Sequence, residues 1–145
     1  MPAYQRHLFG TYLAQVSRAW RSALDRRLAE IGLSQARWLV LLHLSRFNEP
    51  PAQRQLAESV GVEGPTLARL LDNLEQQGLV QRIVDTQDRR AKKLILTDSA
   101  RQLITTIEDI AAELRDQVLQ GISEEEQQIC QGVHTRILAN IEKNL

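Results

Sequence analysis

Polar side chains suited to reading the edges of DNA bases recur along one predicted helix, residues 65–77. If the leucines of this segment are buried, the side chains left on the opposite side are Thr66, Arg69, Asn73 and Gln76. Arginine can donate two hydrogen bonds to guanine, asparagine or glutamine can pair with adenine, and threonine can contact a phosphate or a thymine methyl group. Arg69 is the first candidate and Thr66 the second, and Asn73 and Pro65 complete the predicted set. The alternative is a helix face that is polar only because it is solvated.

Basic side chains gather on a hairpin predicted to follow this helix. Strands are expected at residues 79–84 and 92–96, which are rich in β-branched and aliphatic residues, and a polar segment joins them. The basic residues of the hairpin are Arg82, Arg89, Arg90, Lys92 and Lys93. Such a tip suits contact with phosphates or a narrow minor groove, and Asp88 could support one guanidinium so that it projects in a fixed direction. The alternative is a solvated tip, because runs of charge are usually exposed.

A helix-turn-helix would position these side chains. A first short helix is predicted at residues 53–59, and the positions that such a motif constrains are occupied by suitable types, namely Gln53, Ala57, Gly61, Leu67 and Leu70. The alanine allows the two helices to cross closely, and the glycine can take the positive φ of the turn. An ordinary helix pair with a glycine turn is the alternative. The hairpin directly after the second helix favours a winged helix-turn-helix.

Long helices are expected on both sides of this module. Apolar residues recur at spacings of three and four over residues 8–31, and similar stripes follow Thr97 and Ser123. Residues 35–46 are apolar nearly all round, which predicts a helix buried on several sides. The predicted fold class is mainly α with a small β-wing, that is, a winged helix-turn-helix flanked by long N- and C-terminal helices.

Capping residues predict where several of these helices begin and end. Ser34 is expected to cap the helix at residues 35–46. Gly64 is expected to cap the helix at residues 65–77, with Pro65 as its first residue. Gly78 suits a left-handed residue after the helix end, Thr97 is expected to cap the long helix that follows it, and Ser123 opens a capping box.

Composition limits the class of protein. The chain has 145 residues, of which 43% are hydrophobic and 25% charged, and this suits one globular domain rather than a disordered chain. No apolar run could span a membrane and no secretory signal is visible, so a cytoplasmic location is expected. A single cysteine, Cys130, excludes an internal disulfide and a multi-cysteine zinc site, and we expect it to be buried and inert.

The charges balance in total but not along the chain. There are 18 basic and 18 acidic residues. Residues 1–50 carry seven basic and three acidic side chains, residues 51–98 seven of each, and residues 99–145 four basic and eight acidic. Because screening confines charge interactions to about 10 Å, a zero total does not exclude a nucleic-acid partner for a local basic patch.

Catalytic and metal-binding patterns are missing from the sequence. His7, His43 and His134 lie far apart, and there is neither an HExxH motif nor a glycine-rich phosphate loop. His43 falls on the helix expected to be buried, where a hydrogen-bonded structural histidine is the simpler interpretation. We expect no enzyme activity, no cofactor and no metal site.

Several segments resemble a known family. Residues 88–97, DRRAKKLILT, have an aspartate, any residue, an arginine and a closing Leu-Thr, and residues 61–80 have the form of a recognition helix followed by a strand. Together with Trp20-Arg21 and Ala36-Arg37-Trp38, these segments make nearly the whole chain resemble the MarR/SlyA family of winged-helix transcription regulators.

The resemblance implies a homodimer that binds a pseudo-palindromic operator in double-stranded DNA. Recognition helices would enter major grooves about 34–36 Å apart, and the wings would reach the flanking minor grooves. Arg90 would be the wing arginine and Asp88 its supporting aspartate, with Arg89 and Lys92 beside them. The parts implied are two dimerisation segments, residues 1–33 and 99–145, and a DNA-binding lobe, residues 34–98. Terminal helices that fold back over a monomeric core are the alternative.

The resemblance also implies a bacterial repressor that a small aromatic carboxylate or phenolic compound releases from DNA. Arg18 and Arg21 could bind the carboxylate and Trp38 the ring. The alternative is that Trp38 packs in the core and that the arginines lie along apolar surface or pair with acids. A second function class is a winged-helix module for dimerisation or protein interaction without specific DNA binding.

Overall fold

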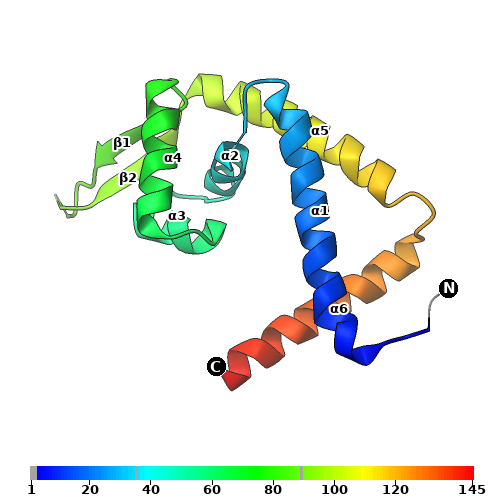
Figure 1. Cartoon of the computed structure of the whole chain (residues 1–145). Helices are drawn as coiled ribbons and strands as arrows, with labels where there is room; N and C mark the ends of the chain where they lie inside the picture. Colours follow the sequence, from blue (N-terminus) through cyan, green and yellow to red (C-terminus); the bar gives the residue numbers. More distant parts are fainter. Residues whose placement is uncertain (1–2, 35, 89) are drawn as a thin grey trace. The chain divides into compact units, whose positions relative to one another are not determined.

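The chain has the element order predicted from its sequence (Figure 1). The computed structural model describes residues 3–34, 36–88 and 90–145, and the chain divides into two compact units, Met1–Ala112 and Glu113–Leu145. The elements are a 3-10 turn η1 (Arg6–Leu8), α1 (Phe9–Ala29), α2 (Arg37–Ser45), α3 (Gln53–Val60), α4 (Gly64–Gln76), β1 (Val80–Val84), β2 (Lys92–Leu96), α5 (Asp98–Val118) and α6 (Glu124–Asn144). The predicted fold class, mainly α with one small antiparallel sheet, is confirmed.

A leucine-rich core holds the helices of the first unit together. Six of the nine residues of α2 are buried, as the lack of a polar face predicts. Fully buried side chains of this core are Leu28, Leu41, Leu56, Leu67, Leu71, Leu74, Leu94 and Ile107. Since α4 supplies three of these leucines, one side of that helix is fixed against the core.

Two predicted helix starts are wrong by one or two residues. The N-cap of α2 is Ala36, in the left-handed region with a φ of 65°, and not Ser34. The guanidinium of Arg37 donates to the carbonyl of Ser34 (3.1 Å) and to that of Gly32 (3.2 Å), so this side chain occupies the turn where a cap was expected. In α4 the N-cap is Glu63 and Pro65 is the second residue, a position that also needs no amide hydrogen.

The end of α4 has the form predicted from its glycine. Gly78 has a φ of 74°, and the N–H of Leu79 donates to the carbonyl of Leu74 (2.9 Å) while that of Gly78 donates to Glu75 (3.0 Å). These two bonds are those of a Schellman motif, which turns the chain directly into β1.

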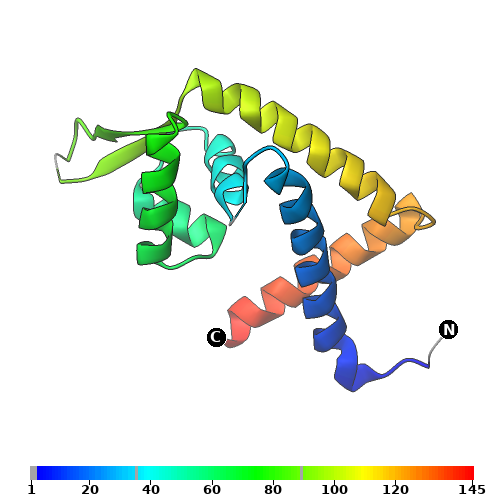
Figure 2. The same ribbon diagram turned by 45° about the horizontal axis from the view of Figure 1, so that its top comes forward.

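The hairpin of β1 and β2, with its tip at residues 85–91, forms the wing. Its strands pair antiparallel from Val80 opposite Leu96 to Val84 opposite Lys92. On the other side of β2, the N–H of Leu94 donates to the carbonyl of Pro51 (3.0 Å). The base of the wing is therefore held by the loop between α2 and α3 as well as by β1, and its tip extends beyond α4 (Figures 1 and 2).

Thr97 closes the base of the wing and starts α5. Its hydroxyl donates to the carbonyl of Gly78 (2.7 Å) and accepts from the N–H of Ala100 (3.2 Å). One side chain thus links the end of α4 to the start of α5, as the predicted cap requires.

The second unit contains α6, none of whose residues is buried in the single chain. The capping box at its start is confirmed, since Ser123 Oγ accepts from the N–H of Glu126 (3.1 Å) and Glu126 Oε1 accepts from that of Ser123 (3.1 Å). Large apolar side chains of α6 are exposed in the single chain at Ile129, Leu138 and Ile141. Cys130 is also exposed, so the expectation of a buried thiol is wrong for the single chain: no residue of α6 is buried.

The described helices include none that is both long enough and apolar enough to cross a membrane.

Candidate nucleic-acid interface

The exposed side of α4 carries the polar row predicted from the sequence. Arg69 and Asn73 are exposed, Thr66 is half-buried, and Pro65 is exposed at the start of the helix. Because positions 66, 69 and 73 are three and four residues apart, they lie along one stripe of the helix. The amide of Asn73 donates to the carbonyl of Arg69 (3.1 Å), which orients it along the helix and leaves its oxygen free to accept.

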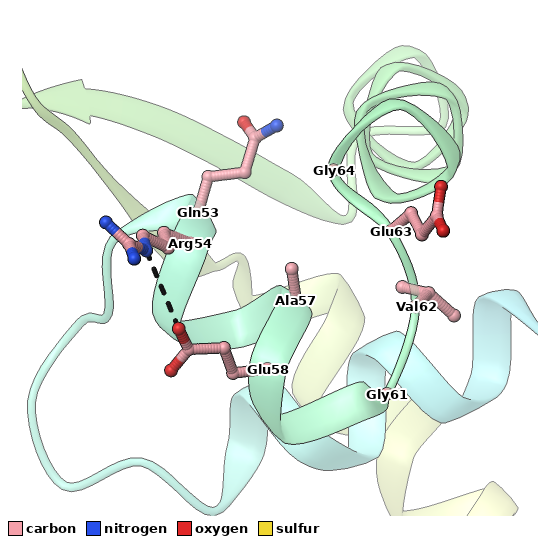
Figure 3. Close-up of a pocket in the computed structure, with 8 residues that line it drawn as sticks. All are labelled: Gln53, Arg54, Ala57, Glu58, Gly61, Val62, Glu63 and Gly64. Atoms are coloured by element: carbon pink, nitrogen blue, oxygen red, sulfur yellow. Dashed lines mark ion pairs between the residues drawn. The ribbon is translucent and has the colours of Figure 1, made fainter.

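The turn between α3 and α4 leaves the start of α4 exposed at the surface. Gly61 has a φ of 81°, and Ala57 is buried where the two helices approach each other, as the motif predicts. A groove lined by Gln53, Ala57 and the turn itself opens beside this turn (Figure 3). Arg54 and Glu58 pair along its rim at 3.5 Å, with both side chains largely exposed. The arrangement presents the first turn of α4, the part of a recognition helix that meets base edges.

The tip of the wing is organised by two aspartates. Asp85 Oδ1 accepts from the N–H of Gln87 (3.0 Å), and Asp88 Oδ1 accepts from the N–H of Arg90 (3.0 Å). The Asp88 carboxylate therefore holds the backbone at Arg90. Its expected support of a guanidinium stays a prediction, because one of the two candidate arginines lies outside the described residues. Arg90 and Lys92 are exposed, and Arg89 lies outside the described residues.

Arg82, which we counted in the basic patch of the wing, does not face outward. Its side chain is only 18% exposed and pairs with Asp72 of α4 at 2.8 Å and with Glu75 at 3.8 Å. Its second guanidinium nitrogen lies 3.4 Å from the carbonyl of Ala68. The acids are visible in the sequence, but which side of α4 faces β1 depends on the packing of the core. The patch left on the described residues consists of Arg90, Lys92 and Lys93.

Comparison with known proteins decides the family. A family model described as MarR family matches residues 31–91. The solved structure of the transcriptional regulator PA3341 is 65% identical in sequence, covers 93% of this chain and 98% of its own, and superposes with a TM-score of 0.87. This chain belongs to the MarR family. The resemblance found in the sequence is therefore confirmed.

Two further structures place this MarR-family chain among more distant relatives. The DNA complex of MepR from S. aureus is 25% identical, with 95% of this chain and 99% of that chain covered and a TM-score of 0.81. The transcriptional regulator SlyA is 24% identical, with 92% and 94% covered and a TM-score of 0.82, and this match concerns the fold. The relative PA3341 is named as a transcriptional regulator and not as an enzyme.

His43 of this MarR-family protein joins α2 to α3. Its Nδ1 lies 2.7 Å from Ser59 Oγ, and the side chain is half-buried. Burial lowers the pKa of His43 below 6.5, and the positive charges of Arg46 and Arg21 lower it further. A neutral, hydrogen-bonded imidazole fits the structural role expected of this residue.

The three residues predicted to bind an effector occupy different environments. Trp38 is buried, with 4% of its surface exposed, and its indole N–H donates to the carboxylate of Asp25 in α1. Arg18 and Arg21 are exposed on α1. The polar atom of Trp38 is thus already bonded within the protein. Within the described residues, no cluster of three or more histidine, cysteine, aspartate or glutamate side chains could hold a metal ion.

Proposed function

We propose that this MarR-family protein is a DNA-binding transcription regulator that acts as a homodimer on a pseudo-palindromic operator. The observation that carries the proposal is the presence, within one unit, of an exposed polar stripe on α4 and of a wing whose Arg90 is bonded at its backbone by Asp88. One is suited to a major groove and the other to the adjacent minor groove. That its relative MepR has been solved with DNA supports the same interpretation.

In the proposed complex α4 reads base edges through its first two turns. Arg69 is exposed, and no ion pair with another described residue occupies its guanidinium. Both of its forked donors are therefore available for a guanine. Thr66 and Asn73 lie on the same stripe, and Pro65 starts it.

The wing would supply the second kind of contact. Arg90 is held at its backbone by Asp88, so its side chain leaves the tip from a fixed point. Lys92 adds charge nearby, and Arg89, outside the described residues, belongs to the same proposal. A narrow minor groove has an enhanced negative potential that favours an inserted arginine.

Dimerisation would cover apolar surface that a single chain leaves exposed. In α1, Phe9, Tyr12 and Val16 are between 47% and 58% exposed, and in α6 Ile129, Leu138 and Ile141 are between 48% and 63% exposed. Apolar side chains gathered on helices in this way are typical of interfaces between chains. We accordingly propose residues 1–33 and 99–145 as the dimerisation segments and residues 34–98 as the DNA-binding lobe.

An effector is a separable part of the proposal. In this part of the proposal the protein is a repressor that a small aromatic carboxylate or phenolic compound releases from DNA. The guanidinium groups of Arg18 and Arg21 would bind the negative charge of that compound. Since the indole N–H of Trp38 is bonded to Asp25, that residue would offer only ring contact. Calorimetric measurement of the affinity for salicylate, used as a probe, tests this part alone. The wild type should bind salicylate more tightly than Arg21→Ala.

Binding selection on random duplex DNA tests the central proposal. The expected result is an enriched sequence with two-fold symmetry, because two identical lobes would read two half-sites. The double variant Arg69→Ala, Arg90→Ala, selected in parallel, should lose the enrichment while remaining folded by circular dichroism. A folded wild type that enriches no sequence at low salt would reject the proposal in favour of a protein-interaction module.

A further inference from the structure

Arg82 stands where the wing leaves the body of the first unit. On β1, Val80 and Arg82 point to the same face of the strand, since side chains two apart share a face. Val80 is buried at 1% exposure and the Arg82 side chain is 18% exposed, whereas Ile83 and Val84 beyond them are 40% and 58% exposed. Arg82 is therefore the last side chain of β1 that the rest of the unit encloses.

Three groups of α4 converge on this guanidinium. Asp72 Oδ1 lies 2.8 Å from Nη1, Glu75 Oε1 lies 3.8 Å from the same nitrogen, and the carbonyl of Ala68 accepts from Nη2 at 3.4 Å. Residues 68, 72 and 75 are spaced four and three apart, so they form one stripe of α4. By the same geometry this stripe lies between the buried leucines and the row of Arg69 and Asn73.

We propose that Arg82 is a positioning residue that locks the wing to the recognition helix, so that α4 and the wing tip meet DNA as one rigid reader. This inference rests on the proposed function. The chain from α4 to β1 turns at Gly78, and the base of the wing is bonded at Thr97. On the β2 side, the N–H of Leu94, the residue opposite Arg82, donates to the carbonyl of Pro51 in the loop before α3. At the same level on the β1 side, Arg82 supplies the side-chain cross-link to α4 itself. Its charge is engaged by two carboxylates, so it acts through the position of Arg90 and not by touching phosphate.

A double-mutant cycle between Arg82 and Arg90 tests the proposal on the enriched operator. Arg90→Ala should weaken operator binding by about tenfold in the wild type, a change of about 1.4 kcal/mol, and by less than about twofold once Arg82→Gln is present. The two single variants should lower the salt dependence of binding by the same amount, about 0.9 in the log–log slope, and the double variant by no more than either. Additive losses of affinity, or a slope loss of about 1.8 in the double variant, would show that Arg82 contacts DNA independently.

Asp72→Asn tests the same lock from the other side and does not depend on removing a cation. Removing a negative charge from a DNA-binding face should tighten binding if only charge matters. The lock predicts the opposite, a several-fold weaker affinity, because the wing is no longer held. Glu63→Gln is the matched control, since this exposed acid at the start of α4 takes part in no ion pair among the described residues, and it should bind equally well or more tightly. Tighter binding by Asp72→Asn would overturn the inference.

Hydrogen exchange without DNA separates failure of the lock from failure of the proposed function. Amides of residues 82–94 should exchange faster in Asp72→Asn than in the wild type, while those of α2 should not change. Equal exchange in the wing would overturn the lock even if DNA is bound. If the wild type binds no duplex, both the proposed function and the role of Arg82 in positioning the wing for DNA are overturned. Faster exchange in Asp72→Asn would then show that Arg82 is a structural cross-link only.

Discussion

Arg69, Arg82 and Arg90 differ in how far the protein already uses each guanidinium. Arg82 is paired with two carboxylates of α4, and the backbone N–H of Arg90 is bonded by Asp88. Within the part of the chain that the structure describes, the guanidinium groups of Arg90 and Arg69 form no ion pair. An arginine without internal partners gives up no existing bond on reaching a base or a phosphate. This difference supports the proposed roles, namely base contact for Arg69, groove contact for Arg90 and internal support for Arg82.

Replacement of Arg69 by alanine should relax sequence preference at one base position. Loss of a forked contact to guanine is expected to cost about 1–3 kcal/mol on the preferred sequence and little on others. Affinity measured against operators with each base at every half-site position checks this. If Arg69→Ala weakens binding to all of them equally, the residue contacts phosphate instead.

Replacement of Arg90 by alanine should weaken operator binding and reduce its salt dependence. Each phosphate contact adds about 0.9 to the slope of log affinity against log salt, so the slope should fall by about that amount. Arg90→Lys is the matched control, because it keeps the charge and should keep the slope while losing the fork that fits a narrow groove. A slope unchanged in Arg90→Ala would remove this residue from the interface.

At the scale of elements, local signals predicted most of the architecture. The turn at Gly78, the cap at Thr97 and the capping box at Ser123 all depend on neighbours within a few residues, and each was recovered. The start of α2 was not, because the side chain of Arg37 fills the turn and Ala36 takes a left-handed conformation. Local patterns do not report such bonds.

Interactions between elements were the part that the sequence did not predict. The sequence contains Asp72 and Glu75 on the predicted helix and Arg82 on the predicted strand. That they form ion pairs can be predicted only if one knows which stripe of α4 faces β1. The same limit applies to Trp38 and Asp25, which bring α1 and α2 together through one hydrogen bond. Candidate contact residues were thus predictable by type, whereas those that hold the elements in place were not.

The contact between α2 and α3 should make stability depend on pH through His43. Burial and the nearby Arg46 and Arg21 lower the pKa of His43 in the folded state, so the unfolded chain binds more protons as the pH falls below 6.5. The stabilisation is present above that pH and is lost as the pH falls toward the lowered pKa. Urea unfolding at about pH 7.5 and about pH 5.5 measures how much the free energy of unfolding falls on acidification. This fall should be smaller for His43→Gln than for the wild type.

His7→Gln provides the control for this measurement, since His7 is an exposed histidine of η1 and lies outside α1 to α6. Its loss on acidification should match that of the wild type. An equal acid-induced loss in His43→Gln and in the wild type would mean that protonation of this imidazole does not oppose folding.

At the scale of the whole molecule, the zero net charge limits how the protein can bind DNA. With 18 basic and 18 acidic residues, general attraction to a polyanion is weak, and a few placed arginines must supply the electrostatic contacts. Two linked lobes increase affinity without more charge, because the second half-site is bound at a high effective concentration. If it acts as the proposed homodimer, a neutral regulator of this kind should depend strongly on dimerisation for its affinity for DNA.

Breaking the dimer should accordingly cost most of the operator affinity. Sedimentation equilibrium of the wild type should give about twice the chain mass of 16.5 kDa, and Ile141→Asp, which places a charge on the exposed apolar stripe of α6, should shift the mass toward that of one chain. Binding to the full operator should then fall by more than tenfold, toward the affinity for a single half-site. Gln128→Asp adds the same charge at an exposed polar position of α6 whose neighbours three and four residues away are Glu124, Glu125, Gln131 and Gly132, and it should leave mass and affinity unchanged. A wild type that sediments as one chain yet binds the full operator as tightly as before would show that α6 serves some purpose other than pairing the two lobes.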